Sequence, residues 1–309
     1  MRSPDAIPAV VTGGPGLQTA AEHWRELVRK RVSQQVRMLS ARTGGRRVTH
    51  GHEAGAIAAT APPWWFARGE SLDNVDHDPM MCRLRAVLGP TSTVIDIGSG
   101  TGRFALRLAP HVAEVTAVDE SEDNLIQLRH HAARLGVRNI RTIRGRWGDV
   151  EVDCADVAYS SYVLPLVEDG AGFLAKLDRA AGRLALVYFA AVNPDSLFDP
   201  FWCFYHGETR NAGASYLDAE AVLAELGVPP DIEIVEVPIQ TRFTSLAQAT
   251  DEIGEYLVLP ATDDVRTALQ NQLARWLVAE GGTLRPPMKT YPAVIISWHP
   301  GTCGESSAA

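Results

Sequence analysis

The stretch VIDIGSGTGRFALRLA, from Val94 to Ala109, decides the fold of this chain. VIDIG is typical of a buried strand that ends in a glycine, and FALRLA places apolar residues at helical spacing. Nearly every side chain between the two segments is small. A backbone this bare is typical of a loop that a nucleotide-like ligand approaches so closely that side chains would clash with it. The stretch therefore predicts a ligand-binding loop between a strand and a helix.

Strands and helices alternate along the rest of the chain. Apolar runs typical of strands lie at 92–98, 114–119, 139–145, 153–161, 182–190, 232–239 and 293–298. Helical spacing of apolar residues occurs at 79–88, 101–109, 121–136, 169–181, 217–226, 245–258 and 262–280. Repeated βα alternation with short connections predicts an α/β fold, a doubly wound and mostly parallel seven-stranded sheet with helices on both faces.

Other segments extend this pattern. Residues 1–78 are expected to form an N-terminal extension with a Pro- and Gly-rich start, a long helix at 17–42 and an aromatic lid segment. Residues 79–309 are expected to form the main domain. Within it we expect a substrate-pocket insertion or helical lid after the fifth strand, at about 194–216, and a helical insertion at about 245–280.

Composition excludes several classes of function. The 309 residues, 46% of them hydrophobic, suit one large domain with extensions. A net charge of −8 argues against a general binder of nucleic acid or of anionic membranes. The four cysteines are scattered without a CxxC pair, so we predict neither a zinc knuckle nor a disulfide framework, and we expect a cytoplasmic protein. Arginine far exceeds lysine and alanine is abundant, which indicates a bacterial source. No apolar run reaches the roughly 18 residues of a membrane span.

The glycines of the loop distinguish between known ligand loops. Asp96, Gly98, Gly100 and Gly102 form the pattern D-x-G-x-G-x-G. A dinucleotide fingerprint would place its third glycine at Arg103, and a Walker loop would contain Gly-Lys, which is missing here. The pattern instead resembles motif I of the class I S-adenosylmethionine-dependent methyltransferases, over about residues 79–190.

The resemblance implies which residues hold the cofactor, S-adenosyl-L-methionine, and its product S-adenosyl-L-homocysteine. Asp119 ends the second strand, where the family's acid binds the ribose hydroxyls. After the third strand the family places a polar and then an apolar residue beside the adenine, and this chain departs from that pattern with Arg146 and Trp147. The expected cofactor-binding residues are Asp96, Gly98, Ser99, Gly100, Gly102, Asp119, Glu120, Arg146, Trp147 and Ser160.

Three segments are expected to line the acceptor site, because ligands of open α/β sheets bind at the carboxyl ends of the strands. They contribute the predicted substrate-binding residues Trp64, Trp65, Tyr162, Trp202, Tyr205 and His206. Aromatic residues of this kind suit an apolar or planar small molecule. His206 is the best candidate for a general base, because its unperturbed pKa lies near neutrality, and Glu208 or Tyr162 could share that catalytic role.

The sequence leaves several alternatives open. The leading hypothesis is a methyltransferase that acts on an oxygen, nitrogen or carbon of a small molecule. A protein acceptor, less readily RNA, and a cofactor-binding protein that no longer transfers methyl groups are the alternatives. Ser160 and Ser161 stand where metal-dependent relatives carry ligands, so no metal is expected. The long N-terminal helix could pair two copies of the chain as a homodimer.

Overall fold

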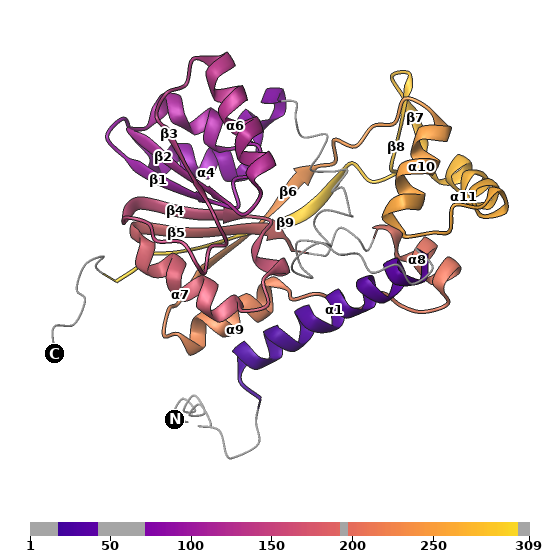
Figure 1. Cartoon of the computed structure of the whole chain (residues 1–309), viewed down its shortest axis with the longest axis horizontal. Helices are drawn as coiled ribbons and strands as arrows, with labels where there is room; N and C mark the ends of the chain where they lie inside the picture. Colours follow the sequence, from indigo (N-terminus) through magenta and orange to yellow (C-terminus); the bar gives the residue numbers. More distant parts are fainter. Residues whose placement is uncertain (1–17, 43–71, 192–196, 302–309) are drawn as a thin grey trace, which may run out of the picture.

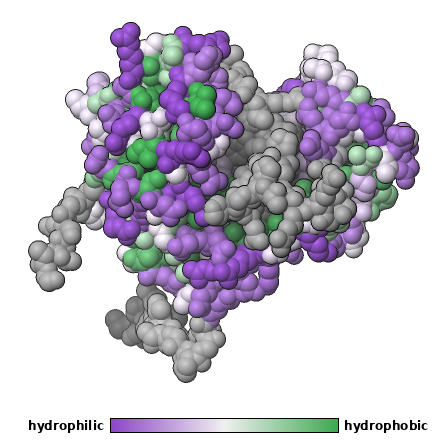
Figure 2. Space-filling model, viewed as in Figure 1, coloured by the Kyte–Doolittle hydropathy of each residue, from purple (hydrophilic) through white to green (hydrophobic). Residues whose placement is uncertain are grey.

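The structure, a computed structural model, describes residues 18–42, 72–191 and 197–301. The predicted lid residues Trp64 and Trp65 lie outside these ranges. The described part consists of a sheet domain and a smaller lobe, with a long N-terminal helix running below both (Figure 1). On the face that Figure 2 shows, exposed hydrophobic side chains are scattered among hydrophilic ones.

A seven-stranded sheet forms the centre of the molecule, as predicted. Its strand order is β3-β2-β1-β4-β5-β9-β6. Strand β9 runs antiparallel to both of its neighbours, whereas β1 to β5 pair in parallel. The strands are β1 Thr93–Ile97, β2 Glu114–Asp119, β3 Ile140–Arg144, β4 Ala155–Ser161, β5 Ala181–Ala190, β6 Asp231–Pro238 and β9 Thr290–Trp298. The mostly parallel sheet puts the carboxyl ends of β1, β2, β4 and β5 at one edge.

Helices cover both faces of the sheet, and each face has its own hydrophobic core. One core packs α4 (Pro79–Val87) and α5 (Ala105–Leu108) on the sheet, with η2 (Ala109–His111) following, and α6 (Glu122–Leu135) lies on the same side (Figure 1). The other core packs α7 (Gly170–Ala180), α9 (Tyr216–Glu225) and part of α1 (Ala20–Arg42) on the opposite face. Residues of β1 therefore alternate between two apolar layers, as a central parallel strand requires. Short 3-10 helices η1 (Leu72–His77) and η3 (Leu164–Leu166) complete this domain.

The lobe has a third core and one element that the sequence analysis missed. It contains α8 (Asp199–His206), α10 (Leu246–Tyr256), α11 (Asp263–Trp276) and the hairpin β7 (Val278–Glu280) and β8 (Thr283–Arg285). The predicted helix at 262–280 is therefore wrong at its end. The chain turns at Gly281 and Gly282, both at positive φ, and this pair favours a two-residue hairpin turn.

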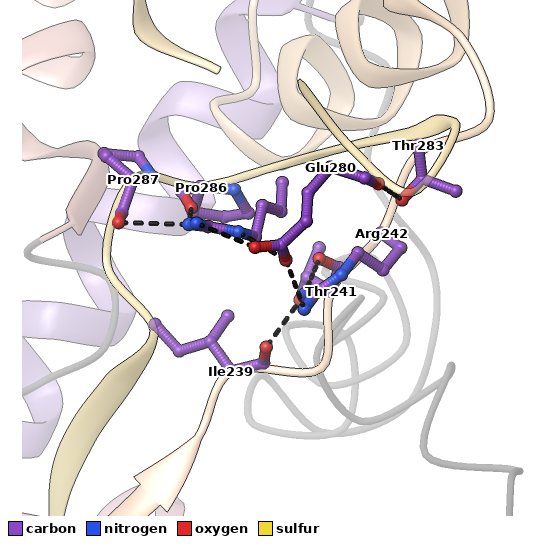
Figure 3. Close-up of polar contacts among 8 residues, drawn as sticks. Ile239, Thr241, Arg242, Glu280, Thr283, Pro286 and Pro287 are labelled. Atoms are coloured by element: carbon purple, nitrogen blue, oxygen red, sulfur yellow. Dashed lines mark hydrogen bonds and ion pairs between the residues drawn. The ribbon is translucent and has the colours of Figure 1, made fainter. Parts of the chain in front are cut away.

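Two of the chain segments between the sheet and the lobe, the one after β6 and the one before β9, are held by one carboxylate (Figure 3). Arg285, which is 6% exposed, donates to Glu280 from Nε at 2.9 Å and from Nη2 at 3.3 Å. Its Nη1 donates to the carbonyls of the next two residues, both prolines. Arg242 lies 3.6 Å from the same carboxylate and donates to two carbonyls of the other connection. We call this group the neck cluster.

Helix α1 docks on its own chain. Trp24 is fully buried, and its Nε1 donates to the carbonyl of Val167 at 2.8 Å. A Cβ atom at Gly170 would lie 2.5 Å from the indole, so only glycine lets α7 approach this ring. Glu225 of α9 accepts a hydrogen bond from the first residue of the helix. The apolar face of α1 is thus used within the chain, and pairing of two copies through this helix stays a prediction.

The cysteines have more than one role. Cys82 and Cys203 are free thiols, whereas Cys154 is disulfide-bonded. The scattered spacing of the four cysteines gave no sign of that bond.

Candidate active site at the glycine loop

The glycine loop bends away from β1 at the edge of the sheet. Gly98, Gly100 and Gly102 have φ of +73°, +54° and +93°, which favour glycine. The three glycines have different surroundings. A Cβ atom at Gly98 would lie 2.2 Å from Val163, and one at Gly102 would lie 2.9 Å from Leu128. These two glycines therefore allow the loop to pack closely on the chain.

Gly100 is different, because a Cβ atom there would meet nothing within 4 Å. Its backbone borders open space, which is the cradle expected of a ligand loop. Next to it, Ser99 is 6% exposed, and its Oγ has no hydrogen-bond partner among the described residues. A buried hydroxyl without a partner is rare and calls for an explanation such as a missing ligand. The loop therefore fits a group that brings polar atoms close to the main chain.

Asp119 is joined directly to this loop. Its Oδ2 accepts a hydrogen bond from the backbone nitrogen of Gly100 at 2.8 Å. Its Oδ1 accepts from the backbone nitrogen of Ser121 at 2.9 Å and from Nδ2 of Asn124 at 3.2 Å. A carboxylate has about four acceptor positions, and three are used here, so about one remains for a ribose hydroxyl. The next residue, Glu120, is exposed and lies 3.8 Å from Nε of Arg146 at the rim.

Asp96 lies in β1 just before the loop and is 2% exposed. Burial raises the pKa of its carboxyl to about 7, opposed by the nearby Tyr159 hydroxyl and increased by the Asp119 carboxylate. A cationic ammonium beside it would be stabilised by the ionised form. The position therefore suits the amino-acid end of the cofactor, as the resemblance implies.

Two predicted cofactor residues have structural partners that the sequence did not reveal. Trp147 is 6% exposed, and its Nε1 donates to the carbonyl of Phe173 on α7 at 3.2 Å. The Lys176 ammonium lies over the Trp147 ring, 4.7 Å from the ring centre. Ser160 is 1% exposed and donates to the carbonyl of Ile97 across the β1–β4 pair at 3.0 Å. Their roles toward the cofactor stay predictions.

The predicted acceptor residues fall into two places. Tyr162 lies directly after β4, beside the glycine loop, because the neighbouring Val163 fills the space in front of Gly98. Trp202, Tyr205 and His206 lie on α8, Glu208 follows it, and Trp64 and Trp65 lie outside the described residues. His206 contacts the carbonyl of Leu257 through Nε2 at 2.7 Å. The ring of Trp202 lies 4.3 Å from the imidazole.

The remaining α8 residues differ in their surroundings. Glu208 accepts from Arg37 at 2.5 Å and from Gln34 at 3.0 Å, both on α1, and these contacts hold its pKa below the usual range. Trp202 Nε1 and the Tyr205 hydroxyl are buried atoms without a hydrogen-bond partner among the described residues. These contacts tie His206 to the lobe and Glu208 to α1, and the catalytic role of both residues stays a prediction.

Sequence reasoning missed two partners of this site. Asn124, in the first turn of α6, holds the Asp119 carboxylate. Its signal was the sequence ESEDN, an N-cap serine followed by polar residues directly after the second strand. The other is Tyr291 of β9, whose hydroxyl lies 2.5 Å from the Tyr162 hydroxyl. No local sequence pattern predicts a contact between residues so far apart in the chain.

Residues 18–42, 72–191 and 197–301 show neither a metal site nor a helix that could span a membrane. Within them, no group of three or more His, Cys, Asp or Glu side chains is arranged to hold a metal ion. None of the helices in the described ranges is long and apolar enough to cross a membrane.

Comparisons with known proteins agree with the geometry of the loop. Residues 88–201 match a family model of a methyltransferase domain. The ubiquinone biosynthesis O-methyltransferase of Alkalilimnicola ehrlichii is 35% identical over 95 residues, which are 30% of this chain and 38% of that protein. The chain thus matches well under half the length of that curated relative.

Solved structures resemble the fold at lower identity. The YcgJ protein from Bacillus subtilis is 17% identical, with a TM-score of 0.49, over 72% of this chain and 96% of that chain. The magnesium protoporphyrin IX methyltransferase from Synechocystis PCC 6803 is 16% identical, with a TM-score of 0.49, over 77% and 86%. The family match rests on residues 88–201, which contain the glycine loop, Asp119 and Tyr162. Over these residues the chain thus matches a methyltransferase domain, in agreement with the resemblance of its glycine loop to motif I of the class I S-adenosylmethionine-dependent methyltransferases.

Proposed function

We propose that this chain transfers a methyl group from S-adenosylmethionine to an oxygen, nitrogen or carbon of a small, apolar or planar molecule. The observation that carries the proposal is the open cradle at Gly100, bordered by the unpartnered Ser99 hydroxyl and tied to Asp119 at 2.8 Å. When bound, the cofactor supplies a methyl group on a positively charged sulfur.

Each residue of the cradle has a part in binding. Asp119 would accept a hydrogen bond from the ribose, and Asp96 would face the ammonium of the amino-acid end. The loop backbone would hold the ligand without side chains in the way. Much of the acceleration in such a transfer comes from holding the acceptor in line, so the chain needs no single obligatory catalytic group.

The small-molecule acceptor has two supports. The matched relative is named an O-methyltransferase of ubiquinone biosynthesis, which is a small-molecule pathway. In addition, two aromatic residues of α8, the buried Trp202 and the half-buried Tyr205, each have a buried donor without a partner among the described residues, Trp202 Nε1 and the Tyr205 hydroxyl. Apolar walls with a few polar groups are typical of small-molecule sites.

A nucleic-acid acceptor is disfavoured by the charges of α1. Its cations face acids of the same chain: Arg29 lies 2.6 Å from Glu168, and Arg37 lies 2.5 Å from Glu208. A paired helix of this kind offers little of the free positive charge that phosphate binding uses. A protein acceptor and a binding protein without transfer activity are outcomes that the experiment must separate.

The experiment combines binding and transfer. The purified chain is titrated with S-adenosylhomocysteine by calorimetry, and the same preparation is incubated with methyl-labelled S-adenosylmethionine and pools of small molecules, proteins or RNA. We expect micromolar binding and label in the small-molecule pool. Binding without label in any pool would favour the inactive binding protein, and no binding by the folded chain would overturn the proposal.

A further inference from the structure

One residue beside the glycine loop holds an unusual backbone conformation. Tyr162 directly follows β4 and has a φ of +59°. This left-handed region is uncommon for a residue with a bulky side chain, and such a residue stays there only where the surrounding structure enforces it. The glycines of the loop need no enforcement at positive φ, because they lack a Cβ atom. Specific contacts must therefore hold Tyr162 in this conformation.

Three contacts from two other strands hold Tyr162. Its backbone nitrogen donates to the carbonyl of Tyr188 in β5 at 2.7 Å. Its ring lies edge-on against the Tyr188 ring, with 5.1 Å between the ring centres. Its hydroxyl lies 2.5 Å from the hydroxyl of Tyr291, at the start of β9. The last of these contacts joins two side-chain hydroxyls, so a substitution can remove it while both rings stay in place.

Tyr291 is built into the sheet on both sides of β9. It pairs with Val237 of β6, and the carbonyl of the next residue, Pro292, accepts from the backbone nitrogen of Ala191 at 2.9 Å. Because β9 is antiparallel to β5, its beginning lies at the carboxyl end of β5. Burial raises the pKa of Tyr162 and of Tyr291, so both hydroxyls keep their protons near neutral pH and one donates to the other.

The conformation of Tyr162 sets the position of the next residue, Val163. A Cβ atom at Gly98 would lie 2.2 Å from Cγ2 of Val163, so this side chain packs directly on the first glycine of the loop. On the other side, the backbone nitrogens of Gly98 and Ser99 donate to the carbonyl of Val118 in β2 at 2.8 and 3.0 Å. A change of φ at Tyr162 would redirect the chain that follows and move Val163 away from Gly98.

We propose that Tyr291 is a positioning residue for the cofactor loop. Its hydroxyl holds Tyr162 in the left-handed conformation, and Tyr162 in turn keeps Val163 against Gly98 before the cofactor binds. A loop that is already ordered loses less conformational freedom on binding, so the affinity for the cofactor rises. This inference rests on the proposed function. It gives β9, which lies outside the residues 88–201 that match the family model, a part in cofactor binding.

The test measures the affinity of the full chain for S-adenosylhomocysteine by calorimetric titration and its stability by chemical denaturation. Tyr291→Phe and Tyr162→Phe each remove one hydroxyl and keep the ring. Each should weaken binding by about 5- to 30-fold, the factor that corresponds to the cost of a left-handed residue. Because the two hydroxyls form one contact, the double variant should bind no more weakly than either single variant.

Tyr256→Phe is the matched control for loss of a hydrogen-bonded hydroxyl. The Tyr256 hydroxyl accepts from Arg210 Nη1 at 2.9 Å within the lobe. Its removal should lower the free energy of unfolding and leave the affinity for S-adenosylhomocysteine unchanged.

A rescue variant separates positioning from a general loss of structure. Glycine adopts positive φ without a steric cost, so Tyr162→Gly needs no hydroxyl contact to keep Val163 in place. In the Tyr291→Phe background, Tyr162→Gly should therefore bind S-adenosylhomocysteine more tightly than Tyr162→Phe does. The same variant should be less stable, because it has lost a ring that packs on Tyr188. A purely structural role would rank affinity and stability in the same order.

The outcomes distinguish this inference from the proposed function. If the unchanged chain binds S-adenosylhomocysteine and Tyr291→Phe binds it equally well, Tyr291 does not position the loop. Losses that add up in the double variant, or no gain from Tyr162→Gly, would also overturn the inference. If the folded, unchanged chain does not bind S-adenosylhomocysteine at all, the proposed function itself is wrong.

Discussion

The carboxylate of Asp119 accepts a hydrogen bond from the backbone nitrogen of Gly100 at 2.8 Å, so the end of β2 fixes the loop that follows β1. One side chain thus has two functions: it holds the loop, and it keeps about one acceptor position for a ligand. A carboxylate at this position can organise the cradle before the cofactor arrives, which lowers the cost of ordering the loop on binding.

Replacement of Asp119 by alanine should therefore weaken cofactor binding. The variant loses hydrogen bonds to a charged group, each of which contributes about 1.5–3 kcal/mol, and this corresponds to a roughly 10- to 150-fold weaker affinity. Titration with S-adenosylhomocysteine measures the change. Asp119→Asn is the matched control, because the amide oxygen can still accept from Gly100, and it should lose less. Unchanged affinity in the alanine variant would exclude the ribose role of this residue.

The glycines of the loop should separate into binding and folding positions. Gly100→Ala places a methyl group into open space at positive φ, so it should cost about 1–2 kcal/mol of stability but weaken cofactor binding by tenfold or more, about 1.4 kcal/mol. Gly102→Ala directs its methyl group at Leu128, so the overpacking should cost about 1–3 kcal/mol of stability, in addition to the cost of the positive φ that it shares with Gly100→Ala. Thermal unfolding and the same titration measure both effects.

Gly213→Ala is the neutral control for this pair, since Gly213 has neither a positive φ nor a close neighbour. If Gly100→Ala bound the cofactor as tightly as the unchanged chain, the cradle would not be the ligand site.

The neck cluster should stabilise the junction between sheet and lobe. Arg285→Lys keeps the charge beside Glu280 but loses the planar group that also reaches two proline carbonyls. Two lost hydrogen bonds predict a destabilisation of about 1–3 kcal/mol, measured by chemical denaturation. Arg242→Lys is the control, because the Arg242 side chain is 40% exposed. We expect this variant to lose less than about 1 kcal/mol of the free energy of unfolding. Equal losses in the two variants would contradict a special role for the buried arginine.

Local patterns in the sequence predicted most of the fold. All seven strands of the large sheet lie at segments that the sequence predicts as strands. The central parallel strands are the clearest, because a strand that is buried on both faces needs an uninterrupted apolar segment. The predicted end of the helix that corresponds to α11 was wrong, because Leu277 and Ala279 continue the helical spacing of apolar residues into β7. There the Gly281–Gly282 pair was the stronger signal, since it demands positive φ at two successive residues.

The site could be predicted only in part. The glycine loop and Asp119 are close together in sequence, and a spacing rule finds them. Tyr162 and Tyr291 are 129 residues apart, and only the antiparallel pairing of β9 with β5 brings their hydroxyls together. Trp147 posed a related difficulty, because its sequence context looks like an open loop, while α7 covers the ring. Contacts that depend on packing between distant elements leave no local signal.

Cofactor binding should depend on pH through Asp96. Its pKa of about 7 means that the carboxyl is mostly neutral at about pH 6 and mostly ionised at about pH 8. If only the ionised form binds the ammonium of S-adenosylhomocysteine, the apparent affinity should be about tenfold tighter at the higher pH. Titrations at the two pH values measure this ratio, and Asp96→Asn should abolish it.

The same group predicts the opposite trend for the cofactor-free chain. The folded pKa lies above that of an unfolded aspartate, so the folded state binds the proton more tightly than the unfolded state does. The resulting stabilisation is complete below the unfolded pKa and is lost as the pH rises through about 7. Unfolding of the cofactor-free chain should therefore become easier between about pH 5 and pH 8, and Asp96→Asn should reduce this dependence. A variant with an unchanged pH profile in both measurements would show that Asp96 does not titrate in this range.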